Sequence, residues 1–125
     1  MTTVEPGSFD AVIFDAGGVF VLPDPTVIAP LLAPFGGSID LELHRRAHYA
    51  GMAAKSRVDA VETDWQVYNE TYVATIGVAA DMAAIAATLL GRTRSADLWR
   101  YPIAENVKAI EELAAVSYTH LTLPT

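Results

Sequence analysis

Apolar positions along the chain change their spacing after residue 15. Residues 11–15, AVIFD, form a short apolar run with valine, isoleucine and phenylalanine, and turn-forming residues follow it directly. Such a run is typical of a strand that is buried on both faces of a parallel sheet. From about residue 24 onward the apolar residues follow helical spacing, so the pattern predicts one strand followed by helices.

Five helices are predicted after the strand. Asp24 and Pro25 are typical of an N-cap followed by proline at the first helical position, and this helix covers 25–35, with Pro30 expected to kink or shorten it. The second helix has a weak point at Gly51. The second helix covers about residues 38–56, and the third, fourth and fifth cover about 62–76, 79–90 and 103–115.

This order of elements indicates an incomplete α/β domain. A single buried strand has no sheet to lie in, so a complete core needs further strands. Residues 92–102 are predicted as the loop that leads into the last helix. Four apolar residues of that helix share one face, namely Ile103, Val107, Ile110 and Leu113. The residues expected on its exposed side are Lys108, Glu111 and Glu112.

Composition argues against several classes of function. The chain has 125 residues, 52% of them hydrophobic, which is enough for a globular core. It contains no cysteine, so disulfides and thiolate chemistry are excluded. A formal net charge of −7 disfavours nucleic acid and anionic membranes as partners. The N-terminal segment lacks basic residues and the apolar run is short, so we predict neither a signal peptide nor a membrane span and expect a cytoplasmic protein.

The last ten residues differ in character from the rest. The segment 116–125, VSYTHLTLPT, resembles the translation of transposase-type sequencing-library adapter DNA in one reading frame. It has no helical period and no relation to the amphipathic segment before it. We therefore expect a coding sequence that was cut near Ala114, an N-terminal fragment, and an adapter-derived artefact at 116–125.

Asp15 is the main candidate for a functional residue. Desolvating a carboxylate at the end of a buried strand costs free energy unless something pairs with it, which favours a functional role. Ligands of open α/β sheets bind beyond the carboxyl ends of the strands, where the sequence places Asp15. Gly17 and Gly18 follow, and glycines permit positive φ and close approach of backbone amides to a phosphate. Aspartate-x-glycine turns are common, so a plain turn residue remains the alternative.

The stretch AVIFDAGGVFV resembles the first motif of the haloacid dehalogenase superfamily of hydrolases, with Asp15 as its aspartate. The resemblance implies an α/β fold with a doubly wound, Rossmann-like core, truncated here after the first strand, and an inserted, mostly helical cap. The stretch LWRYPIAENVKAIEELAA is similar to the segment that returns to the core. The implied parts are the first strand and catalytic loop at 1–22, the cap at 23–98, the return to the core at 99–115, and the artefact at 116–125.

The resemblance also implies roles for the residues of the motif. Asp15 would be the catalytic nucleophile and would bind Mg²⁺ through its carboxylate. Gly17 would bind the same Mg²⁺ through its backbone carbonyl, and the phosphate would lie against Ala16, Gly17 and Gly18. The implied protein is a Mg²⁺-dependent phosphatase for a small phosphorylated molecule. The fragment itself would be inactive, because the serine or threonine, lysine and acidic motifs would follow the second strand.

Gly17 departs from the family pattern, because most phosphatases of the superfamily have an aspartate there that acts as general acid. Loss of a positioned general acid costs about 10²- to 10⁴-fold in rate. One explanation is a phosphatase whose leaving group is good enough or takes its proton from water or its own neighbours, since some phosphatase branches of the superfamily look like D-x-G-G-V. A halide leaving group needs no proton, so a 2-haloacid dehalogenase is an alternative, and a small helical interaction protein is another. The stretch lacks the spacings of a dinucleotide-binding or Walker loop.

Two histidines offer a weaker candidate site. His44 and His48 are four residues apart, a spacing that can place two imidazoles on one metal ion. No third ligand follows, so the favoured interpretation is a solvated polar helix face shared with Arg45 and Arg46. One of these arginines remains a candidate for contact with a substrate anion.

Aromatic residues recur at helical spacing in the third predicted helix. Trp65, Tyr68 and Tyr72 share one helix face. Packing inside the cap is the favoured role, and lining of a substrate pocket is the alternative.

Overall fold

The computed structural model describes residue 5 and residues 7–116, which form a helix-dominated mixed α/β arrangement with a small sheet. In chain order the elements are β1 (Val21–Pro23), α1 (Pro25–Leu32), the 3₁₀ turn η1 (Ala33–Phe35), α2 (Leu41–Arg57), α3 (Gln66–Thr75), η2 (Ala80–Met82), α4 (Ala83–Arg92), η3 (Ala96–Leu98), β2 (Trp99–Pro102) and α5 (Ala104–Val116).

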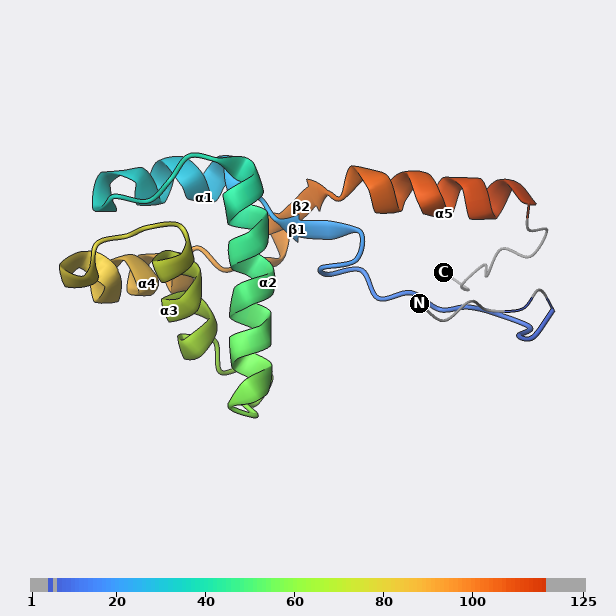
Figure 1. Cartoon of the computed structure of the whole chain (residues 1–125), viewed down its shortest axis with the longest axis horizontal. Helices are drawn as coiled ribbons and strands as arrows, with labels where there is room; N and C mark the ends of the chain where they lie inside the picture. The colour runs from blue at the N-terminus through green and yellow to red at the C-terminus, as the bar shows by residue number, and fades with distance from the viewer. Residues whose placement is uncertain (1–4, 6, 117–125) are drawn as a thin grey trace.

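The antiparallel pair β1 and β2 separates two parts of the molecule. Val21 lies opposite Pro102, and Leu22 lies opposite Tyr101. Between these strands the chain forms α1 to α4, which group on one side of the sheet, whereas α5 extends from the other side (Figure 1). The four helices are therefore an insertion whose entry and exit lie side by side.

Helix α1 begins at Pro25 because Asp24 caps it. Asp24 Oδ1 accepts a hydrogen bond from Thr26 N at 2.9 Å, and Asp24 Oδ2 accepts one from Arg100 Nε at 2.7 Å. Burial alone would raise the pKa of Asp24, but the hydrogen bonds from Thr26 and Arg100 outweigh it and lower the pKa below its usual range. One carboxylate thus fixes both the start of α1 and the returning strand β2.

The core of the inserted helices is built around the aromatic face of α3. Tyr68 and Tyr72 are fully buried, and the half-buried ring of Trp65 meets Tyr68 edge-on with centroids 5.2 Å apart. The predicted packing role of this face is confirmed. Around it gather buried aliphatic residues, among them Ile28, Leu32, Ala47, Val73, Ile76, Ala86 and Leu90.

Gly51 allows α2 to approach α3 closely. A β-carbon on Gly51 would lie 2.6 Å from Tyr68 Cδ2, which is closer than real β-carbons come to other atoms. We expect Gly51→Ala to lower the free energy of unfolding by about 1–3 kcal/mol, because overpacking outweighs the roughly 1 kcal/mol that alanine gains in helix propensity. Urea unfolding followed by circular dichroism measures the difference.

Gly91 provides the matched control in α4. A β-carbon there would meet only the end of the Asn69 side chain, at 3.1 Å, which can move aside. We expect Gly91→Ala to leave stability unchanged or raise it. Equal effects of the two substitutions would show that the contact between Gly51 and Tyr68 does not determine the packing of α2.

The helix predictions agree with the structure apart from some of the ends. Helix α1 stops at Leu32 and continues as η1, because Pro34 has no N–H with which to extend α-helical bonding. Helix α3 begins at Gln66 instead of near residue 62, because Asp64 Oδ1 accepts a hydrogen bond from Gln66 N at 3.1 Å. These differences arise from local capping and proline chemistry.

The strand predicted over 11–15 is not formed. These residues are exposed, with Ile13 at 84%, and they pair with no strand within the described residues. A buried parallel strand needs neighbouring strands to satisfy its backbone, and the described residues provide none beside it. The prediction also missed β1, and it placed β2 inside the loop 92–102.

Val116 ends α5, and the rest of the adapter-like segment, 117–125, lies outside the described residues. Across the part of the chain that the structure describes, no helix combines the length and the apolar character that a bilayer crossing requires.

Candidate functional site

Asp15 stands at the head of a tight turn that leads into β1. The carbonyl of Ala16 organises the turn by accepting backbone hydrogen bonds from the amides of Val19, Phe20 and Val21. The Asp15 side chain is exposed, and its Oδ1 accepts a hydrogen bond from Ala16 N at 2.8 Å. The backbone is therefore fixed, while the carboxylate remains open to solvent.

The inserted helices and β2 hold the two glycines of this turn. A β-carbon on Gly17 would lie 3.1 Å from Trp99 Cζ3, so the turn packs directly against the indole of β2. Gly18 has a φ of +75°, which favours glycine. Tyr49 of α2 donates a hydrogen bond from Oη to the carbonyl of Gly18 at 2.8 Å. The sequence pattern predicts a role for the two glycines but gives no sign of the contacts made by Tyr49 and Trp99.

Helix α5 also holds the turn. Asn106 Nδ2 donates to the carbonyl of Val19 at 2.7 Å, and the amide of Ile103, the residue just before α5, donates to the carbonyl of Phe20 at 2.8 Å. Asn106 was not predicted as a site residue, because its role depends on a contact 87 positions away in sequence. Three elements, α2, β2 and α5, thus converge on the residues that follow Asp15.

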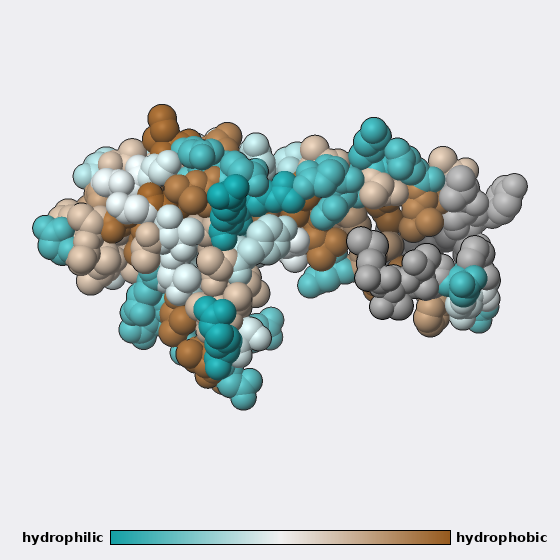
Figure 2. Space-filling model, viewed as in Figure 1, coloured by the Kyte–Doolittle hydropathy of each residue, from teal (hydrophilic) through white to brown (hydrophobic). Residues whose placement is uncertain are grey.

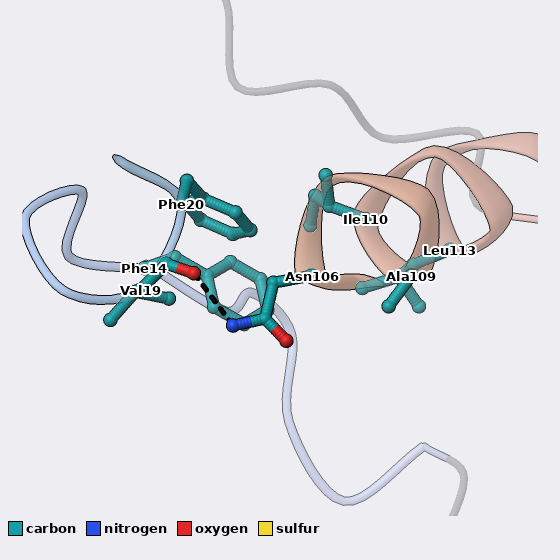
Figure 3. Close-up of a pocket in the computed structure, with 7 residues that line it drawn as sticks. All are labelled: Phe14, Val19, Phe20, Asn106, Ala109, Ile110 and Leu113. Atoms are coloured by element: carbon teal, nitrogen blue, oxygen red, sulfur yellow. Dashed lines mark hydrogen bonds between the residues drawn. The ribbon is translucent and has the colours of Figure 1, made fainter. Parts of the chain in front are cut away.

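An apolar cavity of about 410 Å³ lies between the turn and α5 (Figure 3). The rings of Phe14 and Phe20 meet edge-on at 5.6 Å and face Ile110 and Leu113 of the helix. Hydrophobic surface accordingly extends to the α5 end of the molecule as well as over the inserted helices (Figure 2). The lining suits apolar atoms, so this cavity is not itself a place for phosphate chemistry.

His44 and His48 are buried, at 1% and 3% exposed, so the predicted solvated face is wrong for both. Each Nδ1 lies 2.8 Å from a tyrosine hydroxyl of α3, His44 from Tyr72 and His48 from Tyr68. The signal that could have revealed this arrangement is the same four-residue spacing in both helices, which lets two histidines face two tyrosines.

Burial sets the protonation of these pairs. It lowers the pKa of His44, and together with the nearby Arg94 guanidinium it lowers the pKa of His48 to about 4. Burial also raises the pKa of Tyr68 and that of Tyr72 above their usual range. At neutral pH both imidazoles are therefore uncharged and both phenols are protonated.

The other candidates on α2 gain little support. Within the described residues, no group of three or more histidine, cysteine, aspartate or glutamate side chains is arranged to hold a metal ion. Arg45 pairs with Glu105 of α5, which raises the pKa of Arg45 and lowers that of Glu105, and Arg46 is exposed. Arg45 is therefore already engaged with the first turn of α5.

The two predicted ligands of Mg²⁺ are of the donor type that this ion prefers. The carboxylate of Asp15 and the carbonyl of Gly17 are hard oxygen donors in one turn, and proteins commonly hold Mg²⁺ through one or two carboxylates plus substrate phosphate and water. The predicted phosphate cradle is more restricted. Ala16 N donates to Asp15, and Gly18 N donates to the carbonyl of Val21 at 2.8 Å. Of the three amides, Gly17 N is therefore the one without an acceptor within the described residues.

No protein-family model, curated protein or solved structure matches this chain. The site is defined by its own geometry: an exposed aspartate, a glycine turn with positive φ, and three elements that fix that turn.

Proposed function

We propose that the chain is the N-terminal part of a Mg²⁺-dependent hydrolase of the haloacid dehalogenase superfamily, acting on a small phosphorylated molecule with Asp15 as its nucleophile. The observation that carries the proposal is the exposed Asp15 carboxylate directly before a rigid glycine turn. A nucleophile needs access to its substrate, and a fixed backbone keeps it in position for attack.

The arrangement of elements supports the proposal. Helices α1 to α4 enter and leave through the paired strands β1 and β2, as expected for a cap inserted next to a catalytic loop. Apolar residues before Asp15, including Val12 and Ile13, are exposed, and the cavity against α5 is open. Further strands of a doubly wound core would cover such surfaces.

The chemistry follows from the placement of Asp15. An Asp15 Oδ atom attacks phosphorus, the bond from phosphorus to the leaving oxygen breaks, and that oxygen departs with the electron pair and takes a proton from water. Water then attacks phosphorus of the aspartyl-phosphate, which releases phosphate and restores the carboxylate. Asp15 and Gly17 would hold Mg²⁺, which when bound offsets the negative charge on the phosphoryl oxygens.

The test begins with the source locus. Sequencing through codon 114 gives the continuous reading frame, which is expressed and assayed for phosphate release from a panel of phosphate esters with Mg²⁺ and with a chelator. We expect Mg²⁺-dependent release from at least one small ester, and downstream codons for a serine or threonine after a strand, then a lysine, then paired acids.

The same panel separates the alternatives. It includes 2-haloacids, and halide release without phosphate release would favour a dehalogenase and overturn the phosphatase assignment. A locus that encodes residues 116–125 and then stops, with no hydrolysis by the product, would overturn the hydrolase and favour a helical interaction protein.

A further inference from the structure

Two histidine–tyrosine pairs join α2 to α3 and differ in one respect. In each pair, Nδ1 of the histidine lies 2.8 Å from the tyrosine hydroxyl. In the first pair the other ring nitrogen, Nε2 of His44, bonds to a backbone carbonyl, that of Ser38, at 2.7 Å. In the second pair Nε2 of His48 has no hydrogen-bond partner within the described residues. The first pair therefore serves as an internal reference for the second.

The reference pair fixes its own tautomer. A carbonyl only accepts hydrogen bonds, so Nε2 of His44 carries the proton that is donated to Ser38. Because the imidazole is neutral, Nδ1 is unprotonated and accepts a hydrogen bond from the hydroxyl of Tyr72. All polar atoms of this pair are satisfied.

The same reasoning applies to His48 and Tyr68. The Tyr68 hydroxyl is buried and has no other acceptor within the described residues, so an unpaired hydroxyl proton would be costly there. Tyr68 therefore donates to Nδ1 of His48, and the ring proton lies on Nε2. That nitrogen faces the turn after Asp15, since a β-carbon on Gly18 would lie 3.4 Å from it.

The turn needs an additional donor for an anion. Of the three amides predicted to bind phosphate, those of Ala16 and Gly18 already have acceptors. The Nε2–H group of His48 belongs to a residue that is 97% buried and is held by Tyr68, and it has no protein acceptor within the described residues. Because no fully buried side-chain nitrogen or oxygen among those residues lacks a hydrogen-bond partner, Nε2 reaches solvent and is an oriented donor open to a ligand. A phosphoryl oxygen at the turn would satisfy it.

We propose that His48 is a substrate-contacting residue, whose Nε2–H donates a hydrogen bond to a phosphoryl oxygen bound at the turn Ala16–Gly18. This inference rests on the proposed function and adds to it a residue from the inserted helices. His48 binds and orients the phosphoryl group as a neutral donor, and Tyr68 is its positioning residue. A neutral donor recognises the anion without forming an ion pair with Asp15 that would reduce its nucleophilicity.

Nitrogen-detected NMR of the protein made from the continuous reading frame, labelled with ¹⁵N-histidine, tests the inference directly. The probe is inorganic phosphate with Mg²⁺. We expect the Nε2-protonated tautomer for both His44 and His48 before addition. On addition, the Nε2 signals of His48 shift and its proton exchanges more slowly with water, while the signals of His44 remain unchanged.

Substitutions of His48 give a second readout. His48→Phe keeps a ring but removes the donor, and we expect phosphate affinity to fall about 10- to 100-fold, the scale of one hydrogen bond to a charged group. His48→Gln keeps an N–H near the position of Nε2 and should retain most of the affinity. His44→Gln is the matched control, with affinity equal to that of the unchanged chain.

The outcomes separate this inference from the proposed function. If turnover by the continuous reading frame depends on Asp15 but the His48 signals do not respond to phosphate, the contact is wrong and the hydrolase stands. If phosphate shifts His48 but turnover does not depend on Asp15, the contact stands and the nucleophile is wrong. Equal phosphate affinity in His48→Phe and the unchanged chain would also overturn the contact.

Discussion

Replacement of Asp15 by asparagine is expected to reduce phosphate release by the continuous reading frame by at least about 10⁴-fold, to background. Asparagine matches aspartate in size but cannot attack phosphorus as a carboxylate does, and it also removes a charged ligand of Mg²⁺. Because Asp15 is exposed and bonds only to the amide of Ala16 within the described residues, the substitution should leave stability nearly unchanged. Initial rates at saturating Mg²⁺ measure the effect.

Asp10→Asn is the matched control. Asp10 is an exposed carboxylate on the same segment, before the apolar run. Its replacement by asparagine removes the same charge as Asp15→Asn. We expect its activity to remain within about twofold of the unchanged enzyme, which is the usual behaviour of a surface substitution away from a site. Full activity in Asp15→Asn, or equal losses in both variants, would show that Asp15 is not the nucleophile.

Stability is expected to fall steeply between about pH 6.5 and pH 4. His48 has its pKa lowered by burial and by Arg94 from the usual 6.5 to about 4, so the folded state keeps it neutral while the unfolded chain takes up a proton. The stability that this neutrality contributes is present above pH 6.5 and is lost as the pH falls toward 4. A difference of about 2.5 pKa units corresponds to roughly 3 kcal/mol, and His44 adds a loss of the same sign.

Urea unfolding at about pH 7, 6 and 5 tests this expectation above the range in which most carboxylates titrate. His48→Gln removes one titrating imidazole, so its unfolding free energy should depend less on pH than that of the unchanged chain. The loss attributed to His44 should remain in this variant. A flat unfolding free energy over this range in the unchanged chain would contradict the burial of neutral imidazoles.

Local signals in the sequence predicted the helices well. The N-cap at Asp24, the cap at Asp40 and the apolar spacing of α5 all depend on residues close together in the chain. The strands were predicted poorly for the opposite reason. The run 11–15 has the residue types of a strand, but a strand also requires partner strands. Trp99–Pro102 is a short segment that ends in proline, and it pairs because the inserted helices bring it beside β1.

The candidate site was predicted in part. The turn after Asp15 was predicted from its glycines, since a left-handed backbone at Gly18 is a local property. The contacts of Tyr49, Trp99 and Asn106 with that turn join positions far apart in sequence, so no local sequence pattern predicts them. The burial of His48 was missed because its charged neighbours suggested solvent, although its tyrosine partner decides its environment.

The most direct test of the central claim is to identify the residue that carries the phosphoryl group. The continuous reading frame is mixed with its best ester, quenched within a single turnover and treated with borohydride, which reduces an aspartyl-phosphate to homoserine. Peptide mass spectrometry then locates the reduced residue. Homoserine at position 15, dependent on both substrate and Mg²⁺, is the predicted result. An enzyme that turns over but gives homoserine at another aspartate, or nowhere, would contradict the role assigned to Asp15.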